Sequence, residues 1–172
     1  MSASGQARTD SELPGAPRQV LTFGLGAESY GVDILCVREI RGWAPVTRIP
    51  HSPPFVLGVL NLRGSVVPIV DLRVRFNLET AEFTPLTVII VLSVSSTSGR
   101  REVGVVVDSV SDVVDINAGD IKEAPSFGGK AGGEFIQGLA TITNRMLILL
   151  NVDELIRRDL EQPSAPVLAG AA

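Results

Sequence analysis

The stretch GVLNLRGSVVPIV, residues 58–70, consists of two short apolar runs on either side of Arg63 and Gly64. Short runs rich in β-branched residues and separated by a glycine-containing pair are typical of β-strands joined by a tight turn. We therefore predict a β-hairpin that turns at Arg63–Gly64. Pro68 has no backbone N–H to donate, so its strand is predicted to lie at a sheet edge or to be bulged there.

The sequence on both sides continues this pattern of short strands and turns. Val20–Phe23 and Tyr30–Val32 flank a glycine-rich turn and predict a second hairpin. Further strands are predicted at 86–94, at 102–116 as a bent or interrupted pair, and at 135–142 and 146–150 around a tight loop. Such spacing favours an all-β fold of small antiparallel barrels over a parallel sheet with crossover helices. No internal repeat or heptad pattern is evident.

Helical signals are few. A capping serine, early prolines and a terminal glycine predict a single helical turn over Ser52–Gly58. Asn151 and Glu154 form a capping box, and the apolar residues that follow, up to Leu160, predict a short C-terminal helix. Polar segments at 93–101 and 127–134 are interpreted as loops. Residues 1–18 and 161–172 are interpreted as flexible tails, which leaves a folded body over 19–160.

Composition excludes several classes of function. The chain has a net charge of −4 and few aromatic residues, which does not suit a nucleic-acid binder. Its longest fully apolar run, Val88–Leu92, is far shorter than the roughly 20 residues that span a bilayer. No hydrophobic stretch precedes Val20, so no secretory signal is expected. With 1 Cys and 1 His, the sequence leaves little room for disulfides, metal cages or triads.

None of the candidate motifs for catalysis or for cofactor or metal binding is complete. Gly24–Leu25–Gly26 lacks the third glycine and the helix of a dinucleotide fingerprint. Cys36 lies in an apolar run and is interpreted as a small core residue, while His51 lies in a turn. Four aspartates at 108, 112, 115 and 120 are interpreted as solvated residues that keep a valine-rich segment soluble. We therefore predict no catalytic residue, no metal and no cofactor.

Arg63 is the one residue that calls for a functional interpretation. A solvated turn arginine is the simpler alternative, and the two alternatives have about equal weight. The sharper alternative is an arginine held by an acid and directed at a partner, because a planar guanidinium suits such interfaces. Glu39 is the nearest candidate acid by strand alternation, although a solvated position on a strand face fits it equally well.

Six stretches, spread over most of the folded body, carry a family resemblance. They are YGVDIL (30–35), VREIRG (37–42), VTRIP (46–50), GVLNLRGSVVPIVDLR (58–73), VVVDSV (105–110) and RMLILLN (145–151), and the fourth is long and specific. In these stretches the chain resembles the CheW family, the adaptors of bacterial chemotaxis. The resemblance implies two intertwined five-stranded SH3-like β-barrels with a short C-terminal helix. It also implies a scaffold without activity of its own.

The resemblance further implies a receptor-binding surface. The family's receptor-contact arginine falls at Arg63, with Glu39 as its acidic neighbour. Gly58 and Val88 match positions that line the same apolar groove, at the junction of the barrels. The partner implied for this groove is the helical cytoplasmic tip of a transmembrane chemoreceptor.

A second implied surface binds the regulatory domain of the histidine kinase CheA. Leu21, Ile34 and Val37 fall on its apolar edge, with plain core packing as the alternative for them. The resemblance implies no nucleic acid and no direct membrane insertion. It also implies a monomer outside the signalling array, located in the cytoplasm and recruited to membrane-associated receptor arrays.

Two other functions remain as alternatives. A CheW-like adaptor of a different chemosensory pathway, one that governs surface motility or gene regulation, would have the same sequence features. A small β-barrel that binds a ligand or an oligonucleotide would need a basic groove with aromatic platforms, which this sequence does not offer.

Overall fold

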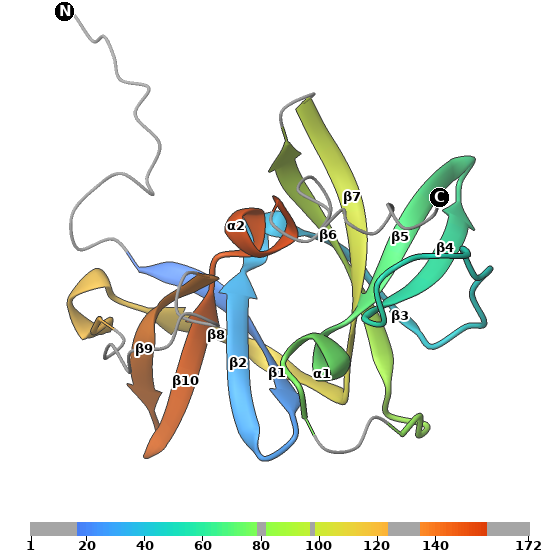
Figure 1. Ribbon diagram of the computed structural model, residues 1–172. Helices are drawn as coiled ribbons and strands as arrows, with labels where there is room; N and C mark the ends of the chain where they lie inside the picture. The colour runs from blue at the N-terminus through green and yellow to red at the C-terminus, as the bar shows by residue number, and fades with distance from the viewer. Residues whose placement is uncertain (1–16, 79–81, 97–98, 124–134, 158–172) are drawn as a thin grey trace, which may run out of the picture.

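The computed structural model describes residues 17–78, 82–96, 99–123 and 135–157. These residues form two five-stranded sheets and short helices (Figure 1). The strands are β1 (Arg18–Leu25), β2 (Glu28–Asp33), β3 (Val37–Gly42), β4 (Val56–Leu62), β5 (Ser65–Asp71), β6 (Val88–Ser96), β7 (Gly99–Val107), β8 (Ser109–Ile116), β9 (Ile136–Ile142) and β10 (Arg145–Leu150). The helices are α1 (Leu72–Arg75), α2 (Val152–Ile156) and the 3-10 turns η2 (Ile34–Cys36) and η3 (Ala118–Asp120).

Each sheet curls into a small SH3-like barrel. Barrel A has the strand order β8-β1-β2-β10-β9, and Lys122 and Leu139 close it with two backbone hydrogen bonds of 2.8 Å. Barrel B has the order β3-β6-β7-β5-β4, and Thr47 and Val59 close it with backbone hydrogen bonds of 2.9 and 2.8 Å. The structure therefore confirms the all-β prediction and the two five-stranded barrels.

The two barrels are built to the same plan, although no repeat is evident in the sequence. In barrel B the β4–β5 hairpin leads into α1, and β5 pairs in parallel with β7. In barrel A the β9–β10 hairpin leads into α2, and β10 pairs in parallel with β2. Residues 56–73 thus correspond to 136–153. The repeat is hidden in the sequence because pairing pattern, rather than residue identity, is what the halves share.

The predicted hairpins are confirmed. Arg63 and Gly64 have φ angles of 54° and 88°, and Thr143 and Asn144 have 49° and 64°. Two consecutive residues with positive φ match the right-handed twist of the strands they join. The long segment at 102–116 is interrupted at Asp108, as predicted, because β7 belongs to barrel B and β8 to barrel A.

Three local predictions are wrong. Residues 52–58 form no helical turn: the Val56 N–H donates to the Pro53 carbonyl (2.9 Å) in a tight turn, and β4 begins at once. The segment at 93–101 is mostly strand, because Arg100 donates to the Ser93 and Ser95 hydroxyls at 3.0 Å and ties the polar ends of β6 and β7 together.

The third wrong prediction concerns Pro68. Its strand, β5, is interior between β4 and β7, although its pairing with β7 begins at Ile69, one residue after the proline.

Leu160, the loop at 127–134 and most of the predicted tails lie outside the described residues. The cap of α2 is confirmed, since the Asn151 side chain accepts from the Glu154 N–H at 3.1 Å.

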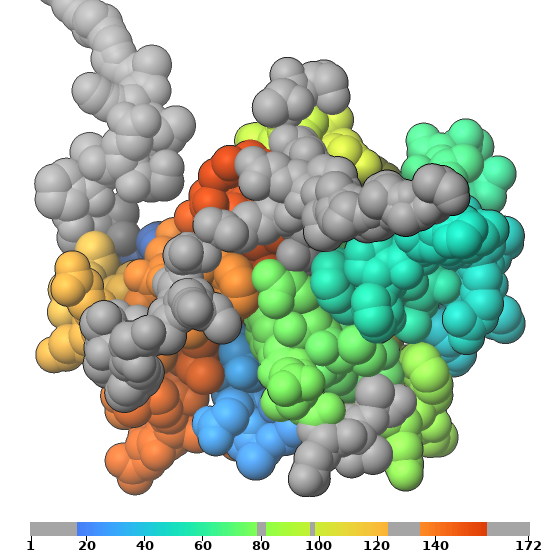
Figure 2. Space-filling model, in the orientation of Figure 1, coloured from blue at the N-terminus to red at the C-terminus, as the bar shows by residue number. Residues whose placement is uncertain are grey.

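The apolar core has three parts. Barrel B has its own cluster around Ile69 and Ile89, and barrel A has one around Val20 and Leu149. The largest cluster takes residues from both barrels and joins their interiors. Figure 2 shows the outcome from one side: the orange and blue surface of barrel A adjoins the green and cyan surface of barrel B.

Candidate functional site

Arg63 occupies the turn between β4 and β5, where backbone geometry fixes its position. The Gly64 N–H donates to the Asn61 side chain at 3.0 Å, which stabilises the turn from within. The Arg63 side chain is 61% exposed. It is therefore rigid at its base and accessible at its tip.

Glu39 reaches Arg63 from β3, at the opposite edge of the sheet of barrel B. The Arg63 Nη1 donates to Glu39 Oε1 at 2.5 Å, and the Arg41 Nη1 donates to Glu39 Oε2 at 3.1 Å. One carboxylate therefore lies between two guanidinium groups. The hypothesis that an acid holds Arg63 is supported, and Glu39 is that acid.

Electrostatics keep this cluster charged. The hydrogen bond from Arg63 lowers the pKa of Glu39, Arg41 adds to the effect, and partial desolvation opposes it. The hydrogen bond from Glu39 raises the pKa of Arg63. Glutamate is ionised at neutral pH in any case, and the lowered pKa of Glu39 keeps the pair charged to a more acidic pH.

The cluster has one more positive charge than negative. The donors of the exposed Arg63 guanidinium are the ones that a partner can reach, whereas the unpaired Nε of Arg41 is buried. Charged donors of this kind bind carboxylates and carbonyl oxygens strongly, and arginine does so with a fixed planar geometry. The site can therefore take an acidic or carbonyl-bearing segment of a partner protein.

Gly58 and Val88 do not join this cluster. Gly58 lies on β4 at a bulge, with a φ of 153°, and a side chain there would overlap the Thr47 carbonyl. Val88 is half-buried and pairs with Gly42, whereas Glu39 pairs with Val91, about 10 Å away along the strand. The structure thus gives Gly58 a close-packing role and places Val88 on another part of barrel B.

A surface pocket does lie at the junction of the barrels. Tyr30 and Leu150 of barrel A line it together with Arg75, Phe76 and Asn77 from the segment that includes α1, and its volume is about 270 Å³. None of the four predicted receptor residues lines this pocket. The Phe76 ring stacks on Phe135 with centroids 5.6 Å apart, so aromatic packing forms the floor of the pocket.

Two of the predicted kinase residues, Ile34 and Val37, lie where the chain first crosses from barrel A to barrel B, and the third, Leu21, lies within β1. Ile34 and Val37 are half-buried and pack against the shared core cluster. Leu21 is 3% exposed and belongs to that cluster, so its side chain is not on the surface. Burial raises the pKa of the Cys36 thiol, which fits its interpretation as a small apolar residue.

Sequence reasoning missed Leu35, which is 76% exposed between these residues. The Asp33 carboxylate accepts from the Leu35 N–H at 2.9 Å and starts the 3-10 turn that directs the leucine outward. The signal was present, because an aspartate two residues before an apolar residue can cap such a turn. Leu35 makes this crossing an exposed apolar surface.

Within residues 17–78, 82–96, 99–123 and 135–157, no three His, Cys, Asp or Glu side chains gather as a metal site requires. In the same part of the chain, no helix is long and apolar enough to cross a bilayer.

Asp108 and Asp112 have specific hydrogen-bond partners: the Gly26 N–H donates to Asp108 (2.7 Å) and the Thr22 hydroxyl to Asp112 (3.0 Å). The interpretation as solvated residues fits the exposed Asp112, Asp115 and Asp120, but it is wrong for Asp108, which is half-buried and also bonds to Arg73.

Comparisons with known proteins agree on one family. The model of the CheW-like domain matches residues 19–160. A chemotaxis protein CheW of Klebsiella aerogenes is 46% identical over 150 residues, which are 86% of this chain and 88% of that protein. A chemotaxis protein CheW of Rhizobium meliloti is 41% identical, over 83% of this chain and 90% of that protein.

A solved structure is similar over most of the fold. It is the crystal structure of the scaffolding protein TtCheW from Thermoanaerobacter tengcongensis, with a TM-score of 0.70 and 30% identity. The match covers 78% of this chain and 88% of that one.

Proposed function

Because this chain belongs to the CheW family and is a scaffold of bacterial chemotaxis, we propose that it links the cytoplasmic tips of chemoreceptors to the histidine kinase CheA. The observation that carries the proposal is the ion pair between Arg63, in the β4–β5 turn, and Glu39, on β3 of barrel B. The pair holds the exposed Arg63 guanidinium in place, and Arg41 gives the cluster a net positive charge. The proposed role is to bind a receptor tip, with no catalytic activity of the protein's own.

A matched set of charge reversals tests this role. Arg63→Glu is expected to weaken binding of a purified receptor-tip fragment at least tenfold, because it places a second carboxylate beside Glu39. Arg145→Glu makes the same charge change on an exposed residue of barrel A and should leave the affinity within twofold. An unchanged affinity in Arg63→Glu, measured by calorimetry, would contradict the assignment.

The swapped variant Arg63→Glu/Glu39→Arg separates two explanations. If the ion pair is needed only to shape the barrel, the swap restores binding. If Arg63 itself contacts the receptor, binding stays weak although the fold recovers. We expect the second result, because the 61% exposed guanidinium is the accessible member of the pair.

We further propose that the first crossing between the barrels, with Ile34, Leu35 and Val37, binds the regulatory domain of CheA. An exposed leucine flanked by half-buried apolar residues forms a contiguous apolar surface, and such surfaces mark sites of protein interaction. Leu21 was assigned to the same surface, but its burial restricts it to supporting that surface from within.

Leu35→Asp tests the kinase surface without disturbing the core. It should weaken binding to the isolated regulatory domain at least tenfold at unchanged melting temperature. Leu86→Asp is the matched control, because Leu86 is 67% exposed and lies before β6, away from the crossing. Equal affinities for the two variants would contradict the proposed surface.

The same function accounts for location and assembly. A monomer in the cytoplasm that binds both partners would be recruited to membrane-associated receptor arrays through the receptors. Bringing a kinase and a receptor onto one body raises their effective concentration and needs no new chemistry.

A further inference from the structure

The two barrels are joined by a shared apolar core and two chain crossings within the described residues. The chain passes from barrel A to barrel B at η2 and returns at Asp108, between β7 and β8. Apolar contacts are non-directional, so the shared core holds the barrels together without strongly fixing the angle between them. Directional polar contacts across the junction are therefore of interest.

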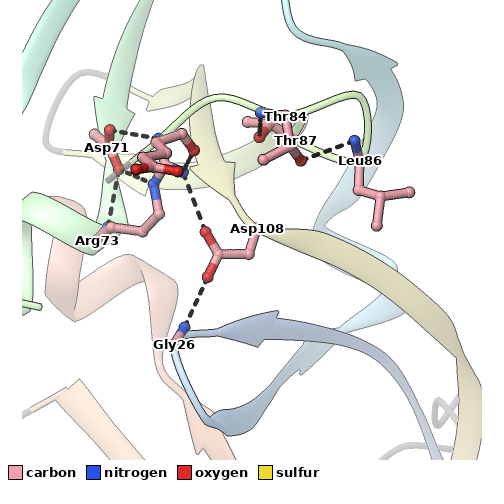
Figure 3. Close-up of polar contacts among 8 residues, drawn as sticks. Gly26, Asp71, Arg73, Thr84, Leu86, Thr87 and Asp108 are labelled. Carbon is pink, nitrogen blue, oxygen red and sulfur yellow. Dashed lines mark hydrogen bonds and ion pairs between the residues drawn. The ribbon is translucent and has the colours of Figure 1, made fainter. Parts of the chain in front are cut away.

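One such contact starts at Arg73 of α1, in barrel B. Its guanidinium is fully buried and bonds to Asp71 of the same barrel through Nε at 2.9 Å and Nη2 at 3.0 Å. Its Nη1 donates to Asp108 Oδ1 at 3.1 Å and to the Glu82 carbonyl at 2.6 Å (Figure 3). Arg73 thus connects barrel B to the second crossing.

Asp108 carries the connection into barrel A. Its Oδ2 accepts from the Gly26 N–H at 2.7 Å, as Figure 3 also shows, and its own N–H donates to the Gly24 carbonyl at 3.0 Å. Gly24 and Gly26 belong to the end of the β1–β2 hairpin. We call the series Arg73–Asp108–Gly26 the first clasp.

A second clasp runs in the opposite direction from the corresponding position of the other half. Asp153 follows the capping Asn151 of α2 by two residues, as Arg73 follows the capping Asp71 of α1. The Asp153 carboxylate accepts from the Ser95 N–H at 2.8 Å, near the end of the β6–β7 hairpin of barrel B. In Figure 1 both helices lie between the barrels.

The clasps are therefore reciprocal. From its second residue, α2 reaches the β6–β7 hairpin of barrel B directly, and α1 reaches the β1–β2 hairpin of barrel A through Asp108. Reciprocal contacts oppose rotation in either sense, because a twist that relaxes one stretches the other. Only the first clasp contains a buried charge, the Arg73 guanidinium, and buried ionic contacts can specify geometry more than they add stability. The Asp153–Ser95 contact is an exposed hydrogen bond to the backbone.

We propose that the Arg73–Asp108–Gly26 and Asp153–Ser95 clasps are positioning devices that set the orientation of the two barrels. On the proposed scaffold function, this orientation holds the receptor-binding cluster at Arg63 and the kinase-binding crossing at Leu35 in register. The clasps touch neither partner. They act through the geometry of the two surfaces.

The variant Asp108→Ala/Asp153→Ala tests the device, because it removes both side-chain links across the junction and leaves the Arg73–Asp71 pair and the Asp108–Gly24 backbone bond intact. Asp115→Ala/Glu154→Ala removes the same charge and is the matched control, since Asp115 is exposed on β8 and Glu154 pairs with Arg157 within its own segment. Nitroxide labels on Thr141→Cys in barrel A and Ser65→Cys in barrel B, in a Cys36→Ala background, report the distance between the barrels by double electron–electron resonance.

We expect one narrow distance distribution in the parent and the control, and a distribution at least twice as wide in the clasp variant. An unchanged distribution in a folded clasp variant would overturn the proposal. If the double variant has no cooperative melting transition, Asp108→Ala and Asp153→Ala are measured singly, and unchanged distributions in both would overturn it equally.

A second measurement separates this proposal from the function on which it rests. The clasp variant should bind a receptor-tip fragment and the CheA regulatory domain, each alone, within twofold of the parent. Receptor-dependent stimulation of CheA autophosphorylation should fall at least fivefold. Full stimulation despite a broadened distribution would overturn the link to signalling. Absence of binding by the parent would refute the scaffold function and leave the distance result standing.

Discussion

Arg63 and Glu39 come from opposite edges of the sheet of barrel B, 24 positions apart, and their side chains meet at 2.5 Å. Their ion pair spans the seam that Thr47 and Val59 close with backbone hydrogen bonds. A side chain that would be mobile on an isolated hairpin is thereby held in one place. Closure of the barrel brings Glu39 and Arg63 together, and their ion pair then holds the guanidinium in place.

The ion pair should be visible in the titration of Glu39. Because Arg63 is the largest cause of its lowered pKa, Arg63→Ala should raise the pKa of Glu39 more than Arg41→Ala does. Carbon-13 NMR of the Glu39 carboxyl group measures both shifts. A larger rise in Arg41→Ala would contradict the assignment.

The sign of the pH dependence follows from that lowered pKa. Stability from the pair is fully present above the pKa of glutamate in the unfolded chain, and it is lost as pH falls through the lower pKa of the folded state. The acid limb of the stability curve should therefore be shallower in Arg63→Ala than in the parent. Urea unfolding between pH 6 and about pH 3 provides the comparison.

Arg73→Met should lower the free energy of unfolding by about 3–5 kcal/mol. It leaves the buried Asp71 carboxylate without its guanidinium partner, which is the costly way to break a buried ion pair. Arg48→Met, at an exposed position, should change stability by no more than about 0.5 kcal/mol. Similar urea midpoints for the two variants would contradict the claim that Arg73 stabilises the fold through its buried ion pair with Asp71.

Gly58→Ala should cost at least about 2 kcal/mol. The φ of 153° is unfavourable for any residue with a side chain, and a Cβ there would overlap the Thr47 carbonyl. Gly42 has open space around it and no unusual φ, so Gly42→Ala should be tolerated within about 0.5 kcal/mol. Thermal melts of the two variants measure the difference, and a stable Gly58→Ala would contradict the close approach of the backbones.

Thr143→Asn should stabilise the protein by about 0.5–1 kcal/mol. Thr143 is β-branched and has a φ of 49°, whereas asparagine accepts this conformation readily. Thr141→Asn is the control, because Thr141 lies in β9, where asparagine is disfavoured, and it should not stabilise. Unfolding free energies for the two variants should have opposite signs of change.

The elements that the sequence predicted well are those determined by local chemistry. The Arg63–Gly64 and Thr143–Asn144 turns join short apolar strands, and their positions follow from residue type and spacing alone. The strand at 86–94 was recognisable because it is buried on both faces. Local residue types gave a wrong prediction at the prolines 53 and 54, where a helical turn was expected and the chain instead forms one tight turn and then enters a strand.

The features that were missed depend on distant partners. Arg73 reads as an ordinary charged residue until Asp108, 35 positions away, is placed beside it. Most corresponding positions of the two halves differ in residue identity, and some also differ in chemistry, with Arg73 against Asp153 and Arg63 against Thr143. A single shared glycine, Gly58 against Gly138, is too little to reveal the repeat from the sequence. For Gly58 and Val88, the structure offers packing roles and no contact with Arg63.

The most direct test of a scaffold is whether it holds both partners at once. The affinity of the protein for a receptor-tip fragment can be measured by calorimetry with and without a saturating amount of the CheA regulatory domain. Separate surfaces at Arg63 and Leu35 predict a ternary complex and receptor affinities within threefold of each other. Displacement of the receptor fragment by the kinase domain, with no ternary complex on sedimentation, would contradict the account.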